Sequence, residues 1–328
     1  MKRNLLSLAI AAAVAVPSVA MADATIYGKI NLSVQTSEEV EAGVTTEDNF
    51  QLQNHSSRIG FKGDAELDYG LTAIYQMEFE VAPDDGSADG DSPFKQRDIF
   101  VGLKGGFGTI KLGKMDTPLK KAQGKVDVFS DIVDMKLLID GENRMSDSIN
   151  YTSPKFAKMV TVSATVIPGE DSGTGADDDD GIADSVSASV VVGDKKYKKQ
   201  PFYAALAYDS DVKDLDTIRA VAGYKWNDLT LGALYQTSEG AESGSTYDED
   251  GFLVSAAYKI EKFTLKGQYI GSDQDAKWEH GGQGGEAFTL GVDYKLGKKT
   301  KTYVYYGTGE NDAKDEYTYA GLGLEHKF

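Results

Sequence analysis

The chain has 328 residues, with 34 basic and 52 acidic side chains, 36 glycines, 18 tyrosines, 7 prolines and no cysteine. The formal net charge of −18 argues against a nucleic-acid-binding protein, which needs a basic face. The absence of cysteine excludes a fold held together by disulfides, and abundant glycine with little proline is typical of many strands joined by tight turns.

Residues 1–22 have the features of a secretory signal peptide. Lys2 and Arg3 form a positive start, an apolar run follows from Leu5 to Val16, and Ala20-Met21-Ala22 is a small-x-small cleavage site. The apolar run is too short to cross a membrane as a helix, and no second run reaches that length. We therefore expect a mature chain of one domain, residues 23–328, that is targeted outside the cytoplasm.

Alternation of apolar and polar residues with a period of two dominates the remaining sequence. Between Leu71 and Val81 the odd positions are apolar, and Gln76, Glu78 and Glu80 lie on the other face. Each such strand places one face against apolar material and the other against water. A soluble β-sandwich and a transmembrane β-barrel both fit this pattern.

A weak internal repeat favours the barrel. Tyr-Lys pairs at Tyr224, Tyr258 and Tyr294 each end a strand and precede a turn of two or three residues. The opposite strand ends are joined by longer polar loops, such as Thr237–Asp250 and Ser272–Gly285. Short turns at one rim and long loops at the other are typical of bacterial outer-membrane barrels.

Sixteen strands can be counted, with no domain boundary between them. In the last one Leu322, Leu324 and Phe328 share a face, and a C-terminal phenylalanine on an alternating strand resembles the signal by which outer-membrane barrels are recognised for assembly. The expected strands start near Thr25, Asn54, Leu71, Lys95, Thr109, Met145, Lys158, Ser185, Phe202, Thr217, Leu229, Gly251, Phe263, Glu286, Thr300 and Tyr317.

Seven segments, in this order, resemble the proteobacterial general-diffusion porins of the Gram-negative outer membrane. The resemblance implies an all-β, transmembrane, 16-stranded antiparallel β-barrel, usually a homotrimer, whose third loop folds inward and narrows the pore. The similar segments are Tyr27-Gly28-Lys29, Ser57–Gly63, Gly102–Gly108, Gly113–Pro118, Asp127–Asp131, Ile149–Phe156 and Glu325–Phe328.

The third loop would run from about Asp116 to Asn143. It lacks clear alternation, yet it carries Val126, Phe129 and Ile132, among other apolar residues. A loop exposed outside the cell has little reason to carry these side chains, whereas a loop packed against the inner wall does.

The resemblance assigns basic residues to the pore wall and acidic residues to this loop. Alternation independently places Arg58 and Arg144 on the water-facing side. Arg97 shares a phase with apolar Ile99, so its neighbour Asp98 would face outward if Arg97 faces the pore. We expect a transverse electric field between the basic wall and the acidic loop. The wall residues are Lys29, Arg58, Arg97 and Arg144, and the loop residues are Asp127, Asp131 and Asp134.

The expected function is passive diffusion of small hydrophilic solutes and ions through a water-filled channel, with a weak preference for cations. One alternative is a channel selective for a substrate such as an oligosaccharide. Such a channel would need a row of aromatic side chains along the lumen, whereas the aromatics here mostly share the phase of lipid-facing residues. A second alternative is an outer-membrane hydrolase, but no catalytic arrangement is evident.

Motifs for nucleotide binding or metal binding are incomplete in this sequence. The segment Gly108–Lys114 nearly spells a P-loop but lacks the Ser or Thr that would follow, and the histidines have no metal-ligand spacing. We expect no enzymatic activity, no cofactor, no metal and no nucleic acid. The expected partners are copies of the chain, outer-membrane lipids and lipopolysaccharide, and the barrel assembly machinery through Phe328.

Overall fold

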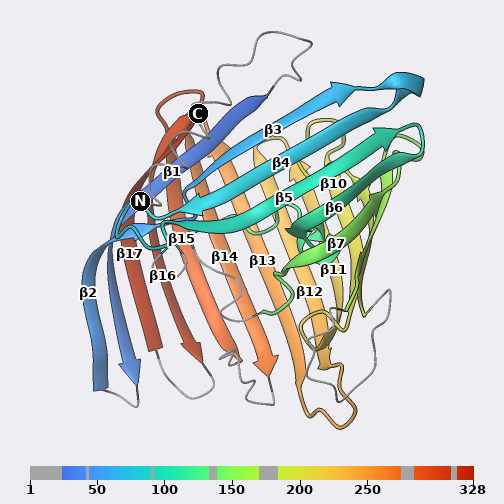
Figure 1. Cartoon of the computed structure of the whole chain (residues 1–328). Helices are drawn as coiled ribbons and strands as arrows, with labels where there is room; N and C mark the ends of the chain where they lie inside the picture. The colour runs from blue at the N-terminus through green and yellow to red at the C-terminus, as the bar shows by residue number, and fades with distance from the viewer. Residues whose placement is uncertain are drawn as a thin grey trace, which may run out of the picture.

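The computed structural model describes residues 24–41, 44–88, 90, 92–132, 139–169, 184–274, 284–311 and 316–328. The strands within these ranges form a single antiparallel sheet that curls into a barrel (Figure 1). They are β1 (Thr25–Glu41), β2 (Val44–Asn54), β3 (Arg58–Glu66), β4 (Thr72–Val81), β5 (Phe94–Gly105), β6 (Gly108–Asp116), β7 (Arg144–Thr152), β8 (Val160–Ile167), β9 (Ser185–Gly193), β10 (Phe202–Ser210), β11 (Leu215–Trp226), β12 (Leu229–Gly240), β13 (Asp248–Ile260), β14 (Phe263–Gln274), β15 (Gly285–Lys295), β16 (Thr300–Asn311) and β17 (Glu316–Lys327).

The first and last strands close the barrel. β1 pairs with β17 from Lys29 opposite Lys327 to Val40 opposite Glu316. β2 and β3 both pair with β1, so they are one strand of the barrel that residues 55–57 interrupt. The seventeen segments in the described ranges therefore make the expected sixteen-stranded barrel.

One expected strand boundary was wrong. The second strand was expected near Asn54, but β2 begins at Val44, and β1 and β2 form a long hairpin (Figure 1). The hairpin residues are mostly polar on both faces, which removes the alternation that marks a half-buried strand. The other strands begin within three residues of their expected starts.

The two faces of the sheet differ as the alternation predicts. On β1, Ile30 and Val34 are exposed on the outside, whereas Asn31 and Ser33 point inward and are only 2% exposed. Apolar side chains can face outward in this way because lipid surrounds a transmembrane barrel. No helix in the described ranges is long and apolar enough to cross a membrane.

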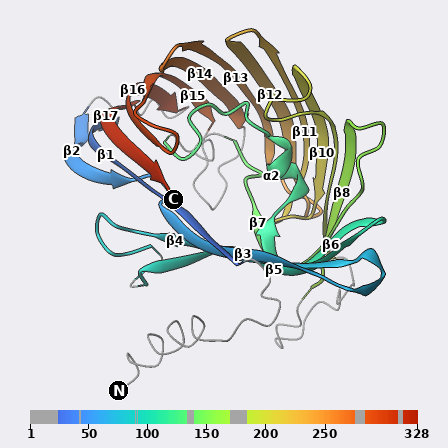
Figure 2. The same cartoon turned by 90° about the horizontal axis from the view of Figure 1, so that it is seen from above.

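The apolar core lies inside the barrel, beneath the third loop. α2 (Pro118–Ala122) begins after Thr117, whose hydroxyl accepts a hydrogen bond from the Lys120 amide, and it lies within the ring of strands (Figure 2). Leu119 of α2 and Val126 beyond it pack against inward-facing residues of β10–β14. Tyr203 on β10 donates a 2.8 Å hydrogen bond to the Ala122 carbonyl, which fixes the end of α2 to the wall.

Most exposed aromatics share the lipid-facing phase, as expected, but tyrosines on β16 and β17 face the lumen. Tyr303 and Tyr305 are 1% and 4% exposed and pack with Phe129 of the loop. Each tyrosine ring lies over a glycine of the neighbouring strand, Gly323 or Gly321, where a Cβ atom would have no room. Tyr303 and Tyr305 therefore form an aromatic surface inside the barrel against which Phe129 of the loop packs.

Candidate functional site: the pore constriction

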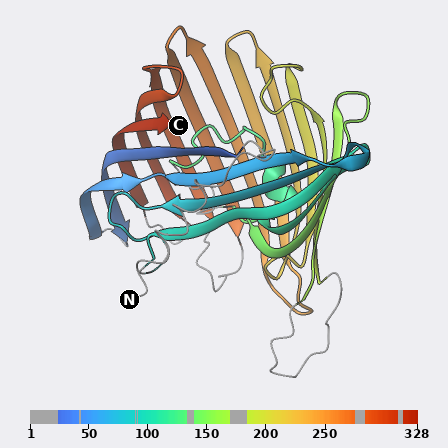
Figure 3. The same ribbon diagram turned by 45° about the horizontal axis from the view of Figure 1, so that its top comes forward.

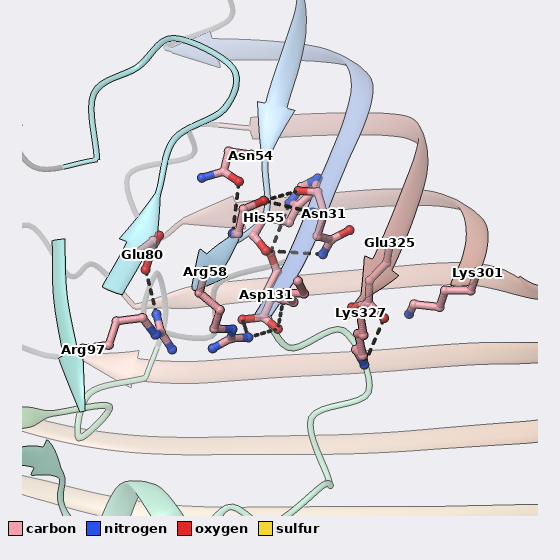
Figure 4. Close-up of polar contacts among 12 residues, drawn as sticks. Asn31, Asn54, His55, Arg58, Glu80, Arg97, Asp131, Lys301, Glu325 and Lys327 are labelled. Carbon is pink, nitrogen blue, oxygen red and sulfur yellow. Dashed lines mark hydrogen bonds and ion pairs between the residues drawn. The ribbon is translucent and has the colours of Figure 1, made fainter. Parts of the chain in front are cut away.

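The tip of the third loop contacts the wall formed by β1 and β3 (Figure 4). Asp131 accepts a 2.6 Å hydrogen bond from Lys29 Nζ on β1 and bonds of 3.1 and 3.2 Å from Arg58 Nη2 on β3. Its backbone is in the left-handed region, with φ at 76°. Although burial opposes ionisation, Arg58 and Lys29 together hold the pKa of the Asp131 carboxyl below its ordinary value.

The interruption between β2 and β3 helps to hold the same loop tip. His55 Nδ1 lies 3.1 Å from the Asp131 carbonyl oxygen, and His55 Nε2 lies 2.7 Å from Ser33 Oγ. Because residues 55–57 leave the ladder at this point, the imidazole can turn toward the loop. No feature of the sequence predicts this contact.

Arg97 lies beside Arg58 but is neutralised by carboxylates of β4. Its Nε donates to Glu78 Oε1 at 2.8 Å and its Nη1 to Glu80 Oε2 at 2.7 Å (Figure 4). Glu78 also lies 3.8 Å from Arg58 Nη1 and accepts a hydrogen bond from Tyr27. Three cations, Lys29, Arg58 and Arg97, thus face three carboxylates, Asp131, Glu78 and Glu80.

A β-bulge explains how Arg97 faces the lumen. Met77 is opposite Ile99 while Phe79 is opposite Gln96, so β5 carries one extra residue between these pairs. The extra residue reverses the phase, and Arg97 faces the lumen although Ile99 faces lipid. The expectation that Asp98 points outward is wrong, because its carboxylate accepts from Arg144.

Arg144 lies between two carboxylates at the start of β7. Its Nε is 2.9 Å from Asp98 Oδ1 and its Nη2 is 2.8 Å from Asp116 Oδ1. Lys120 of α2 reaches the same Asp116 oxygen at 3.3 Å, so the cluster faces the third loop. Arg144 is therefore separate from the Arg58–Arg97 group.

The remaining two acidic candidates differ from Asp131. Asp127 Oδ1 accepts a 2.9 Å hydrogen bond from the Phe129 amide, and burial raises the pKa of this carboxyl to about 7 despite hydrogen bonds from Gln268 and Phe129. Asp134 lies outside the described residues. The expected field between separated basic wall and acidic loop is wrong for Asp131, because that carboxylate touches Lys29 and Arg58 directly.

Sequence reasoning missed three further charged residues. Glu78 and Glu80 were recognised only as polar positions, although they neutralise Arg97. Arg219 on β11 is 0% exposed; it bonds Glu142 at 2.5 Å and the Asp140 carbonyl at 2.8 Å. Arg219 lies in the opposite phase to apolar Ile218 and Ala220, but only the tertiary structure shows that it anchors the returning arm of the loop.

A closed, lipid-facing barrel whose inner wall is polar and charged defines a membrane channel of the porin class. The family model for Gram-negative porins matches residues 9–314. The major outer membrane protein P.IB of Neisseria meningitidis serogroup A is 30% identical to this chain over 353 residues, covering all of both chains. The same protein from Neisseria gonorrhoeae is 28% identical over 376 residues.

Solved structures share the fold at lower identity. An anion-selective porin from Comamonas acidovorans superimposes with a TM-score of 0.76 at 21% identity, over 94% of this chain and all of that one. OmpF of Salmonella typhi, solved in complex with daunomycin, superimposes with a TM-score of 0.66 at 16% identity, over 94% of this chain and 98% of that one.

This chain belongs to the Gram-negative porin family. It is a channel of the outer membrane that allows passive diffusion, as its sequence predicted, and belongs with channels rather than with enzymes.

Proposed function

We propose that Lys29, Arg58, Arg97 and Asp131 form the constriction through which small hydrophilic solutes and ions pass. The observation that carries the proposal is the contact of Asp131, at the loop tip, with Lys29 and Arg58 on the wall. This contact fixes the edge of the loop and hence the size of the opening beside it. Asp127 on the loop and Arg144 at the start of β7 add charge to the approach.

Liposome swelling with sugars of increasing size tests this proposal. Passive diffusion requires a rate that rises linearly with solute concentration and falls with solute size. Asp131→Asn should loosen the loop tip and raise both the conductance and the size limit. Asp228→Asn, at an exposed turn far from the loop, is the matched control; equal effects of the two changes would contradict the assignment.

A substrate-selective channel is less well supported. An oligosaccharide track needs accessible aromatic rings, but Tyr303 and Tyr305 are almost completely buried and pack with the loop residue Phe129. Saturation of the swelling rate with one sugar, but not with its isomers, would favour this alternative. We also propose that the chain has no catalytic activity, since the charged clusters in the part of the chain that the structure describes are mutually ion-paired and leave no activated nucleophile there.

We further propose that the functional unit is a homotrimer, by analogy with other members of the family. Within the described residues β2 pairs only with β1, and its outer side exposes Phe50 and Leu52 at 77% and 49%. An unpaired strand edge with exposed apolar side chains is suited to contact a second chain.

Three finer proposals concern processing and lipid partners. Cleavage after Ala22 would release the mature chain. Phe328, whose amide bonds Gly28 where β17 meets β1, would be read by the barrel assembly machinery before the barrel closes. Lipopolysaccharide would contact the loop-side rim. N-terminal sequencing of the outer-membrane form tests the first proposal, and a start other than Asp23 would contradict it.

A further inference from the structure

The two rims of the barrel carry opposite charge. The rim of short turns comprises residues 66–71, 104–107, 153–159, 194–201, 225–228, 259–262, 295–299 and 327–328, and it holds fourteen lysines against five carboxylate side chains. The loop rim comprises residues 38–48, 82–93, 168–184, 211–214, 239–250, 272–286 and 310–317. Among its side chains that the structure describes, seventeen are carboxylates and one, Lys213, is basic.

The lysines of the turn rim lie close together. One groove there is lined by six lysines and only two carboxylates, Asp293 and Glu325. Lys301 and Lys327, which bond these carboxylates at 2.9 and 3.0 Å, are two of the six (Figure 4). The other four are Lys262, Lys295, Lys298 and Lys299.

The pKa of one group near each rim is shifted in the direction that the charge of that rim favours. Partial burial, and then the charges of Lys196 and Lys327, lower the pKa of Lys125 on the third loop. Partial burial, and then Asp184 and Asp214, raise the pKa of Asp211 at the loop rim. Burial is the larger cause for both groups, and neighbouring charges of the same sign shift each pKa further in the same direction.

The constriction between the rims is almost neutral, because Lys29, Arg58 and Arg97 are matched by Asp131, Glu78 and Glu80. The fixed charge along the pore is therefore negative at the loop mouth, balanced at the constriction and positive at the turn mouth. Figure 3 shows the strands of the barrel running between its two ends.

We propose that this porin conducts asymmetrically, passing more current when the loop side is positive than when it is negative. With the loop side positive, cations enter through the acidic mouth and anions through the basic mouth. Each ion then enters where the fixed charge concentrates it, and both accumulate at the constriction. With the voltage reversed, each ion enters through the mouth that repels it, and the constriction is depleted of carriers.

Salt concentration decides how far the rim charges act. The screening length is about 30 Å at 0.01 M salt and about 3 Å at 1 M. Rim charges therefore reach the pore axis at low salt and are screened at high salt. The current at loop-positive voltage should exceed that at loop-negative voltage at least about twofold at 0.01 M, and the ratio should approach 1 at 1 M.

Single-channel recording of the refolded full chain tests this inference, which rests on the channel function. Because the protein has no native cysteine, Ser243→Cys at the loop rim reports the orientation through its reaction with a charged, impermeant thiol reagent added on one side. Initial currents are measured before any voltage-dependent closure.

Charge variants separate rectification by fixed charge from rectification by shape. Lys262, Lys295, Lys298 and Lys299 are replaced together by Gln, and the matched control replaces the same four lysines by Arg. The Gln variant should lose most of the asymmetry, and the Arg variant should keep it. If the Gln variant does not fold, a second variant with Asp211→Asn, Asp214→Asn and Glu242→Gln should also reduce the asymmetry.

Three results would overturn the inference while leaving the channel function intact: equal currents at 0.01 M, a larger current at loop-negative voltage, or full asymmetry in the neutralised variants. Absence of any conductance in the refolded parent protein would instead contradict the channel function, and the inference with it.

Discussion

Among the single residues, Arg144 carries a positive charge that lies between two carboxylates. It bonds Asp98 and Asp116 and shares the second carboxylate with Lys120. Burial of the ion pairs is incomplete, with 15–22% of these side chains exposed, so water in the lumen screens them. Its contribution to selectivity should therefore exceed its contribution to stability.

Arg144→Ala should shift the reversal potential toward cations, because it leaves Asp98 and Asp116 with less compensating charge. The expected loss of barrel stability is only about 1–2 kcal/mol. Reversal potential in a salt gradient and unfolding of the same variant check both statements. Arg144→Lys, which keeps the charge, is the control; unchanged selectivity with raised stability would show that Arg144 faces lipid.

Asp127 should make selectivity depend on pH near neutrality. Because burial raises the pKa of its carboxyl to about 7, it is ionised at pH 8 and mostly protonated at pH 6. Asp131, whose pKa is lowered by Arg58 and Lys29, stays ionised throughout this range. Cation preference should fall as the pH falls from 8 to 6, and Asp127→Asn should reduce the size of that change. Identical pH profiles of parent and variant would rule out this role.

At the scale of elements, the third loop is held at several points on the far wall. Val128 accepts from Lys266 and donates to Gln268 on β14, and Tyr203 holds Ala122. Arg219 holds the returning arm through Glu142 and Asp140. These contacts tie the third loop to β10, β11 and β14, so the opening is defined by the wall as well as by the loop.

Arg219→Gln should loosen this returning arm. It leaves Glu142, only 8% exposed, without its cation, and the expected cost to stability is about 3 kcal/mol. We expect greater conductance noise and a lower unfolding temperature. Lys225→Gln, at the turn end of the same strand, is the control. Quiet channels of unchanged stability would mean that the arm is held elsewhere.

At the scale of the whole molecule, assembly depends on the outer surface of the barrel. Phe50 on β2 is 77% exposed, the largest exposed fraction among the aromatic side chains facing outward from the hairpin. Burying such a ring against another chain would contribute about 1.5–3 kcal/mol per contact.

Phe50→Ser should weaken the proposed trimer, because three copies of this contact would be lost. Crosslinking and heat-dependent migration in mild detergent measure the change. Ile218→Ser, an exposed outward residue on β11, distinguishes loss of subunit contact from loss of lipid contact. Trimers that are equally stable in both variants would place the interface elsewhere, and a parent protein found only as monomer would contradict the trimer itself.

The sequence by itself determined the barrel, its strand number and most strand starts. In each strand the apolar residues alternate with polar ones because one face meets lipid and the other meets water. This alternation is local to each strand and can therefore be seen in the sequence. Alternation also placed Arg58 and Arg144 on the inner face, because their strands carry apolar residues in the opposite phase.

Only the tertiary structure decided how those charges pair. The bulge in β5 reverses the phase at Arg97 and Asp98, and a bulge depends on the neighbouring strand rather than on local residue preference. Likewise Asp131 meets Lys29 and Arg58, and Arg219 meets Glu142, across separations of 73 to 102 residues. Such contacts arise because barrel closure brings distant strands and the third loop together, and no sequence periodicity encodes which charge will face which.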